Sequence, residues 1–350
     1  MNAPDGKRNL LARTFLDAAG WENAATSPLA GDASNRRYLR IAGQAGEAVL
    51  MDAPPERGED TTPFVAVTEW LLEQGYSAPR ILASDAEAGF LLIEDLGDDL
   101  FARYLERHPE AERKLYEAAV DLLVDCAGRD VPATIGSAGL PLMPYDMDVL
   151  EREAMLLVEW WLPAATGTPV AQKVAGEYRA LVRTAFAPVA DAREVLVQRD
   201  YHAENLLWLP ERDGLARVGL LDYQDALAGH PAYDLVSLLE DARRDTSLDL
   251  QRTMVERYLS ARPELDAPMF CRDYALLGAQ RNLKIVGIFS RLCMRDGKPS
   301  YLGLIPRVWN HLMLDLSHPE LSDLSDWLRK HVPEPESAIL KRIAAEVRRT

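Results

Sequence analysis

Three polar residues of the chain stand in an order that suits phosphoryl transfer. Asn205 follows Asp200 five positions later, and Asp222 comes at the end of an apolar run. Transfer of a phosphoryl group needs a carboxylate that holds the attacking hydroxyl, and oxygen ligands that fix magnesium against the nucleotide phosphates. We therefore predict that Asp200 is the catalytic residue, that Asn205 and Asp222 are metal ligands, and that the cofactors are ATP and Mg²⁺.

Short apolar runs on either side would position these three residues. The strands that we expect cover residues 194–197, 206–209 and 217–221. The dipeptide Asp213-Gly214 lies between the last two runs and favours a hairpin. Such a hairpin would bring Asn205 and Asp222 together, with Asp200 facing them. An ordinary hairpin with solvated acids is the alternative, because Asp and Asn are common in turns.

The motif and its surroundings resemble a known family of small-molecule kinases. The family pattern is matched by Asp-x-His-x-x-Asn at 200–205, Leu-Asp-Tyr-Gln-Asp-Ala at 221–226 and Gly-His-Pro-Ala-Tyr-Asp-Leu at 229–235. These segments resemble the aminoglycoside-phosphotransferase-like enzymes, which are protein-kinase-like. Residues 31–40 and 281–299 are similar to the anomeric kinases for N-acetylmuramate and N-acetylglucosamine, which serve cell-wall sugar recycling. The resemblance runs roughly from residue 10 to residue 330.

The order of the expected elements favours an α+β fold. Strands are expected at 38–41, 48–51, 81–83 and 90–93, and helices at 9–20, 64–73, 101–127, 147–162, 170–187, 233–243, 248–260, 271–294 and from about 319. The resemblance implies a bilobal protein-kinase-like fold, with a small β-rich N-lobe and a larger, mainly helical C-lobe. We place the nucleotide-binding lobe at residues 1–96, and the catalytic and acceptor-binding lobe at 97–350.

Residues 31–35 can form a loop over the nucleotide phosphates. Such a loop needs small residues and backbone N–H groups that point at the ligand. The predicted ATP-binding residues of this region are Ser34, Asn35, Arg36 and Arg37. The same stretch is also typical of a simple polar turn.

The segment 92–97 falls where kinases of this family join their lobes. The resemblance implies that the backbone there pairs with adenine, and it makes Glu94 and Leu96 predicted ATP-binding residues. Without the resemblance, the segment reads as a strand that ends in a turn.

The phosphate-binding lysine of kinase-like folds is missing. It would lie on the third strand, but residues 48–51 read Ala-Val-Leu-Met, and Lys7 is the only lysine in roughly the first 110 residues. Its glutamate partner is displaced too, because Glu69 lies more than a turn beyond the corresponding place. The lysine and the glutamate would be lost together, since either one alone would leave an uncompensated charge. We expect Arg36 or Arg37 to neutralise the phosphates instead.

Residues 281–298 are unusually basic for so acidic a chain. One arc of the expected helix carries Arg281, Lys284, Arg291 and Arg295, and a neighbouring arc carries Ile285, Phe289 and Leu292. The basic arc is either a solvated face or part of an acceptor pocket that meets a carboxylate, such as the lactyl group of N-acetylmuramate. A basic wall would repel polycationic aminoglycosides. We predict that Arg281 and Arg291 bind the substrate.

Four further residues receive predicted roles. Glu159 and Trp160 are predicted to bind the sugar, the ring by stacking and the acid by accepting hydroxyl hydrogen bonds; half-buried packing is the alternative. His202 is expected to order the catalytic loop. Asp234 resembles the family aspartate that braces this loop, so its expected role is structural support.

Composition limits the partners. The 350-residue chain carries a net charge of −16, which disfavours nucleic acid and anionic membranes. Its three cysteines are far apart and its start lacks an apolar signal region, so we expect a cytoplasmic protein. The expected partner is a small-molecule amino sugar, with no nucleic acid, no membrane and no obligate protein partner evident.

We predict an ATP-dependent sugar 1-kinase that phosphorylates the anomeric hydroxyl of N-acetylmuramate, N-acetylglucosamine or both, in peptidoglycan recycling. One alternative is a kinase of another small hydroxyl compound, such as an amino alcohol or an antibiotic. Another is a nucleotide-binding pseudokinase, which the missing lysine favours and the intact Asp200, Asn205 and Asp222 oppose. A protein kinase is disfavoured, because only eleven residues separate Asp222 from Asp234 and no Ala-Pro-Glu follows.

Overall fold

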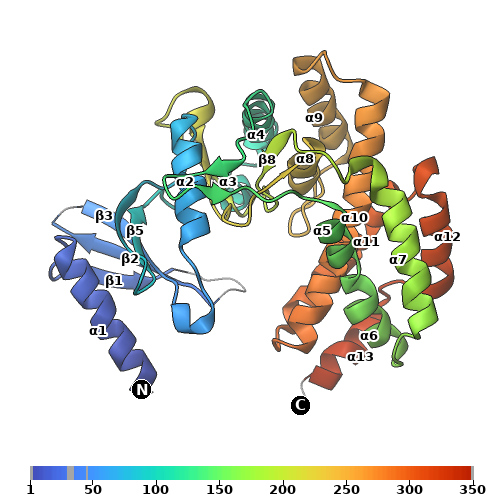
Figure 1. Cartoon of the computed structure of the whole chain (residues 1–350), viewed down its shortest axis with the longest axis horizontal. Helices are drawn as coiled ribbons and strands as arrows, with labels where there is room; N and C mark the ends of the chain where they lie inside the picture. The colour runs from blue at the N-terminus through green and yellow to red at the C-terminus, as the bar shows by residue number, and fades with distance from the viewer. Residues whose placement is uncertain (1–2, 30–34, 45, 348–350) are drawn as a thin grey trace. The chain divides into compact units, whose positions relative to one another are not determined.

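The computed structural model describes residues 3–29, 35–44 and 46–347. Contacts divide the chain into two compact units, each of which is described separately (Figure 1). The first, called the β unit, comprises Met1–Arg107, Pro132–Leu142 and Glu204–Ala226. The second, called the helical unit, comprises His108–Val131, Met143–Ala203 and Leu227–Thr350. The lobe boundary expected between residues 96 and 97 stays a prediction.

A five-stranded antiparallel sheet forms the centre of the β unit. Its strands follow the order β1-β2-β3-β5-β4, with bounds Ala25–Pro28, Arg37–Gly43, Gly46–Asp52, Phe90–Glu94 and Ile81–Asp85. The four expected strands are confirmed as β2 to β5. Strand β1 was not expected, because Ala-Thr-Ser-Pro is exposed along its length and shows no apolar alternation.

Helix α1 (Ala3–Ala18) covers one face of this sheet (Figure 1). Phe15 stacks on Phe90 of β5 with ring centroids 5.6 Å apart, and Ile41 and Leu50 are fully buried beneath the helix. Burying a side chain of this size contributes roughly 1.5–3 kcal/mol. The helix starts earlier than expected and ends just before Gly20, whose φ of 82° suits a residue without a side chain.

Helix α2, a short hairpin and helix α3 also belong to the β unit. Helix α2 (Thr62–Glu73) packs against the short hairpin β6–β7 (Thr134–Ile135 and Leu140–Pro141). Glu69 of α2 accepts hydrogen bonds from the backbone and hydroxyl groups of Ser137, the former at 2.5 Å and the latter at 3.0 Å. Glu69 therefore binds the β6–β7 hairpin. This agrees with the expectation that it is not the glutamate that would pair with the missing phosphate-binding lysine. Helix α3 (Phe101–Arg107) lies in the same unit.

The helical unit is built around α10, a helix of 28 residues that contacts α5, α8 and α11. Its helices are α4 (Glu112–Cys126), α5 (Met147–Ala154), α6 (Leu162–Thr166), α7 (Gln172–Phe186), α8 (Ala232–Leu239), α9 (Leu248–Ala261), α10 (Ala267–Met294), α11 (Ile305–Asp315), α12 (Ser322–His331) and α13 (Ser337–Val347). Strands β8 (Val195–Val197) and β11 (Leu227–Gly229) pair antiparallel. None of the helices in the described part of the chain has the length and apolar character needed to cross a bilayer.

Most expected helices of this unit are confirmed, with three differences. The helix expected at 101–127 is divided into α3 and α4 by a turn that contains Pro109, which cannot continue an α-helix. The helix expected at 147–162 ends at Ala154 and is followed by a π-helical turn, Leu157–Trp161, and then by α6. Helix α11 was not expected. The predicted α+β fold class is confirmed.

Candidate active site

The hairpin that carries the two predicted metal ligands lies in the β unit. Strands β9 (Leu206–Trp208) and β10 (Val218–Leu220) pair antiparallel, as expected. The backbone N–H of Leu221 donates to the carbonyl of Asn205 at 2.9 Å, so Asn205 and Asp222 lie at the same end of the hairpin. Asp222 has a φ of 58°, and its Oδ1 accepts a 2.8 Å hydrogen bond from Gln224.

Hydrogen bonds fix this hairpin within the β unit. The N–H of Trp208 donates to the carbonyl of Asp99, and the N–H of Leu220 donates to the carbonyl of Ser77, both at 2.8 Å. A Cβ atom at Gly219 would lie 3.1 Å from the side chains of Leu207 and Leu209 and 3.4 Å from that of Leu96, so Leu96 packs beside this hairpin. The hairpin end with Asn205 and Asp222 therefore belongs to the same compact unit as the segment predicted to bind adenine.

The side chain of Glu94 is engaged in ion pairs. One carboxylate oxygen lies 3.0 Å from Nε of Arg80, and the other lies 2.8 Å from Nη2 of Arg212. Because both carboxylate oxygens are paired with arginines, we expect the backbone of Glu94, and not its side chain, to contact a nucleotide.

The arginines predicted to meet the phosphates are also ion-paired. Nε of Arg36 donates to Glu59 at 2.7 Å, and Nε of Arg37 donates to Asp52 at 3.0 Å. Asn35 donates to the carbonyl of Arg57 at 3.4 Å. Ser34 lies outside the described residues.

The charges that act on Tyr38 include those of Arg36 and Asp222. Burial raises the pKa of the Tyr38 phenol, the guanidinium of Arg36 opposes this rise, and the carboxylate of Asp222 adds to it. Of the two arginines, it is thus Arg36 that shares its surroundings with a predicted metal ligand. Sequence reasoning missed Tyr38, although its position two residues after Arg36 places both on one face of an extended chain.

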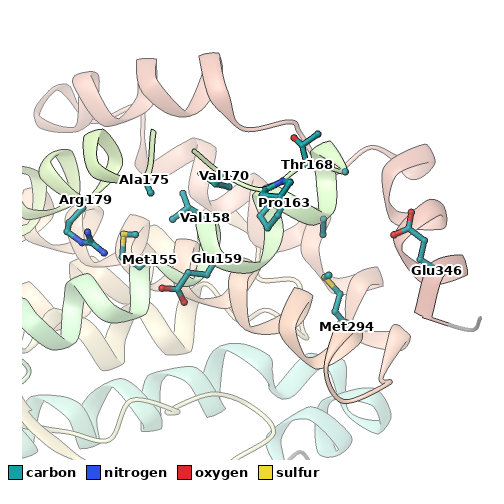
Figure 2. Close-up of a pocket in the computed structure, with 13 residues that line it drawn as sticks. Met155, Val158, Glu159, Pro163, Thr168, Val170, Ala175, Arg179, Met294 and Glu346 are labelled. Atoms are coloured by element: carbon teal, nitrogen blue, oxygen red, sulfur yellow. The ribbon is translucent and has the colours of Figure 1, made fainter. Parts of the chain in front are cut away.

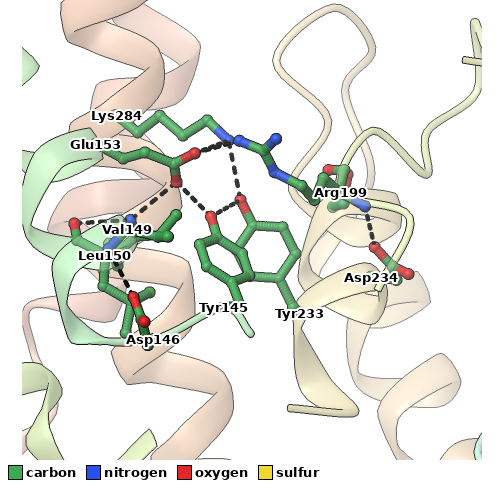
Figure 3. Close-up of polar contacts among 11 residues, drawn as sticks. Tyr145, Asp146, Val149, Leu150, Glu153, Arg199, Tyr233, Asp234 and Lys284 are labelled. Atoms are coloured by element: carbon green, nitrogen blue, oxygen red, sulfur yellow. Dashed lines mark hydrogen bonds and ion pairs between the residues drawn. The ribbon is translucent and has the colours of Figure 1, made fainter. Parts of the chain in front are cut away.

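The Asp200 loop, residues 198–203, belongs to the helical unit, where α8 holds it. Asp234 accepts the backbone N–H of Gln198 at 2.7 Å and that of Arg199 at 2.9 Å (Figure 3). Ser237 donates to the carbonyl of Arg199 at 3.2 Å. The loop makes a sharp turn here, because Arg199 has a φ of 74°. Asp234 thus makes contacts that suit its predicted supporting role.

Asp200 lies in a positive environment. Burial raises the pKa of its carboxyl group, but Lys284, the imidazole of His202, Arg281 and Arg199 together outweigh burial, so the pKa lies below its ordinary value. Asp200 is therefore ionised at neutral pH, as a residue that accepts a proton must be. His202 is buried, and its backbone N–H donates to the carbonyl of Asp200 at 3.1 Å.

Helix α10 contributes part of this positive charge. Arg281 and Lys284 are only 4% and 7% exposed, so the interpretation of the basic arc as a solvated face is wrong for both. Arg281 donates to Ser237 at 2.8 Å, which explains its burial. Arg291 is half-buried and Arg295 is exposed. The neighbouring apolar arc is buried, as expected: Ile285, Phe289 and Leu292.

Glu159 and Trp160 lie on the π-helical turn. Glu159 is exposed and lines a hollow of about 680 Å³ together with Met155, Val158 and Arg179 (Figure 2). Among the described residues, none from the Asp200 loop lines this hollow. Trp160 is half-buried. The role of Glu159 and Trp160 in sugar binding therefore stays a prediction.

The donor set at the hairpin end fits a magnesium ion. Mg²⁺ prefers oxygen ligands and usually keeps several waters and substrate phosphates, so that one or two protein side chains suffice. Asn205 and Asp222 offer an amide oxygen and a carboxylate. In the described parts of the chain, no group of three or more His, Cys, Asp or Glu side chains could hold a metal ion. A metal site here would therefore depend on nucleotide phosphates as well.

Comparisons with known proteins agree with the predicted fold. The model of the phosphotransferase enzyme family matches residues 25–268. A Caulobacter vibrioides protein named N-acetylmuramate/N-acetylglucosamine kinase is 40% identical, covering 93% of the chain and 97% of that protein. A Pseudomonas aeruginosa protein of the same name is 37% identical, covering 89% of the chain and 90% of that protein.

Two solved structures show the same fold at low sequence identity. The GDP and kanamycin complex of APH(2″)-IIIa has a TM-score of 0.59 at 16% identity, covering 89% of the chain and 99% of that structure. The Plasmodium vivax ethanolamine kinase has a TM-score of 0.58 at 10% identity, covering 90% of the chain and 89% of that structure. These likenesses confirm the predicted protein-kinase-like fold.

Proposed function

Since the chain belongs to the phosphotransferase enzyme family, as its motifs predicted, we propose that it is an ATP-dependent sugar 1-kinase. It phosphorylates the anomeric hydroxyl of N-acetylmuramate, N-acetylglucosamine or both. Four similar proteins carry the name N-acetylmuramate/N-acetylglucosamine kinase, at 33–40% identity. The observation that carries the proposal is the placement of Asp200 on a loop whose backbone Asp234 holds, where the charges of Lys284 and Arg281 lower its pKa.

Asp200 orients the anomeric hydroxyl and accepts its proton as the oxygen attacks the γ-phosphorus, while the bond from the γ-phosphorus to the bridging oxygen breaks and ADP leaves. Asn205 and Asp222 hold magnesium. When bound, the metal neutralises charge on the nucleotide phosphates. Because only four residues separate Asp200 from Asn205, their Cα atoms lie within roughly 18 Å of one another whatever the arrangement of the units.

The nucleotide is bound by the β unit. The backbone at Glu94 and Leu96 meets adenine, and Ser34 and Asn35 are the predicted phosphate contacts. In place of the missing lysine we put Arg36, because Tyr38 links it electrostatically to Asp222. Arg37 has the weaker case, since Asp52 occupies it at the sheet.

The acceptor is neutral or anionic. Lys284 and Arg281 act on the carboxylate of Asp200 through their charge, and these buried positive charges would disfavour a polycationic acceptor next to Asp200. Arg291 is the predicted contact for a lactyl carboxylate. The partner is therefore an amino sugar of the peptidoglycan, and we place its recycling in the cytoplasm, where ATP is available.

The test measures ATP consumption over a panel of amino sugars that includes their 1-O-methyl derivatives. We expect turnover with N-acetylmuramate or N-acetylglucosamine and none with the methylated forms, because the attacking oxygen is blocked. Unchanged turnover with a 1-O-methyl sugar would refute phosphorylation at the anomeric position.

The absence of a lysine from β3, which reads Gly-Glu-Ala-Val-Leu-Met-Asp, favours a second candidate, a pseudokinase that binds nucleotide without turnover. The two candidates are separated by magnesium-dependent ATP turnover. A chain that binds ATP but consumes none with any sugar, amino alcohol or aminoglycoside antibiotic would be the pseudokinase.

A further inference from the structure

A buried polar cluster lies beside the Asp200 loop in the helical unit (Figure 3). At its centre is Glu153 of α5, which is 6% exposed. Its carboxylate forms an ion pair with Arg199, lies 3.2 Å from Nζ of Lys284, and accepts a hydrogen bond from Tyr145. The hydroxyl of Tyr233 lies 2.8 Å from that of Tyr145 and accepts from Lys284 at 3.3 Å.

Arg199 of this cluster is the residue immediately before Asp200. Its φ of 74° is unfavourable for a residue with a side chain, and such a conformation persists only where the surroundings enforce it. Asp234 and Ser237 bind its backbone N–H and carbonyl. Glu153 binds its guanidinium, so the backbone and the side chain of Arg199 are fixed from different helices.

The charges of the cluster depend on Glu153. Arg199 and Lys284 are both largely buried, and two buried cations near each other are costly unless an anion lies between them. Glu153 supplies that anion. Both cations also act on Asp200 by their charge. Removing the carboxylate would therefore displace at least one of them and loosen the turn that precedes Asp200.

We propose that Glu153 is a positioning residue that acts through Arg199 to hold Asp200 in place for proton acceptance. The inference rests on the proposed function, in which Asp200 meets the acceptor hydroxyl. An oxygen that must accept a proton during attack tolerates little displacement, because catalytic rates fall steeply with misplacement of about 1 Å. Glu153 should thus affect turnover more than ATP binding, since the predicted nucleotide contacts lie in the β unit.

The experiment compares Glu153→Gln with Glu151→Gln in the full-length protein. Glu151 lies on the same helix and also pairs with two arginines, Arg179 and Arg183, but it makes no contact with the Asp200 loop among the described residues. We expect Glu153→Gln to lower kcat at least tenfold with the KM for ATP unchanged within twofold. Glu151→Gln should leave both constants within twofold of the wild type.

A double-mutant cycle identifies the route. If Glu153 acts through Arg199, the Glu153→Gln/Arg199→Met double variant loses no more activity than the more impaired single variant. Losses that multiply would overturn the route through Arg199. Glu153→Asp should recover part of the lost kcat, because it restores the anion. If Glu153→Gln fails to fold, Arg199→Met removes the same ion pair from the side of the loop. This variant must then also lower kcat while leaving the KM for ATP unchanged.

Hydrogen exchange gives a readout that does not depend on catalysis. Amides of residues 198–203 should exchange faster in Glu153→Gln than in Glu151→Gln. If no sugar supports turnover but exchange rises in this way, the sugar kinase function fails while the positioning role stands. Unchanged exchange together with unchanged kcat would overturn the role of Glu153.

Discussion

The carboxylate of Asp234 accepts the backbone N–H of Arg199 at 2.9 Å, directly before Asp200 in the chain. Because its other oxygen accepts the N–H of Gln198 at 2.7 Å, one side chain satisfies two consecutive buried donors. A carboxylate is an acceptor at both oxygens, whereas an amide is not. The turn before Asp200 therefore depends on the chemical identity of residue 234.

Above pH 7, where the carboxyl group of Asp234 is ionised and accepts at both oxygens, Asp234→Asn should destabilise the protein and slow turnover. The amide NH₂ would face one of the two backbone donors, and an unsatisfied buried donor costs about 1–3 kcal/mol. Denaturant unfolding measures the loss of free energy, and ATP consumption with the preferred sugar measures kcat. A variant as stable as the wild type would contradict the bracing role.

Burial also raises the pKa of Asp234, to about 7, against the opposing backbone hydrogen bonds. A carboxyl group whose pKa is higher in the folded protein stabilises the fold below its unfolded pKa, near 4. That contribution is lost as the pH rises toward about 7. In Asp234→Asn this pH dependence should be weaker between pH 4 and 7, which unfolding at several pH values can measure.

Asp200→Asn should abolish most turnover while nucleotide binding survives. Loss of a positioned proton acceptor lowers kcat by roughly 10²–10⁴-fold. The predicted ATP contacts lie in the β unit, so the dissociation constant for nucleotide should change less than threefold. Single-turnover kinetics and nucleotide titration measure the two quantities, and near-normal turnover would remove Asp200 from the mechanism.

Asp222→Asn should raise the magnesium concentration needed for half-maximal turnover by roughly tenfold or more, because a charged ligand is replaced by a neutral one. Asp213→Asn is the matched control, since Asp213 lies in the connection at the opposite end of the same hairpin and is fully exposed. A magnesium titration of both variants tests the assignment. Equal shifts in the two variants would contradict it.

Arg36→Ala should raise the KM for ATP more than Arg37→Ala does. Arg36 and Asp222 both act on the pKa of Tyr38, whereas Arg37 is paired with Asp52 of β3. Loss of one hydrogen bond to a charged group costs roughly 1.5–3 kcal/mol, about 10-fold to 150-fold in binding. The reverse order of the two variants, or no change in either, would reject Arg36 as the substitute for the missing lysine.

The sequence predicted those parts of the structure that depend on residues close together in the chain. Short apolar runs indicated β2 to β5, and the interval between Asp200 and Asn205 indicated the candidate site. The exposed strand β1 carries no such pattern. The contact between Glu153 and Lys284 joins α5 to α10, which are far apart in the sequence, so only tertiary packing produces it. For the same reason the sequence left a solvated basic arc open as an alternative, where the structure buries two of its cations, Arg281 and Lys284.

A second buried group of acids makes a pH dependence of its own. Asn282 donates to Glu240 at 2.7 Å and to Asp315 at 3.0 Å. Burial raises the pKa of both carboxyl groups, and the charge of Glu240 raises that of Asp315 further. The pair is therefore most stable when it retains a proton. Space for it exists because a Cβ at Gly278 would lie 2.7 Å from both carboxylate oxygens of Asp315.

Asp315→Asn should make the folded protein less sensitive to alkaline pH. In the wild type, the raised pKa values mean that stability is fully present below the unfolded pKa, near 4, and falls as the pH rises through the folded values. The asparagine can donate to Glu240 without titrating, so unfolding free energies measured from pH 5 to 9 should decline less steeply than in the wild type. Asp323→Asn, at an exposed position on α12, is the control and should follow the wild-type curve. Parallel curves for all three proteins would show that Glu240 and Asp315 do not share a proton.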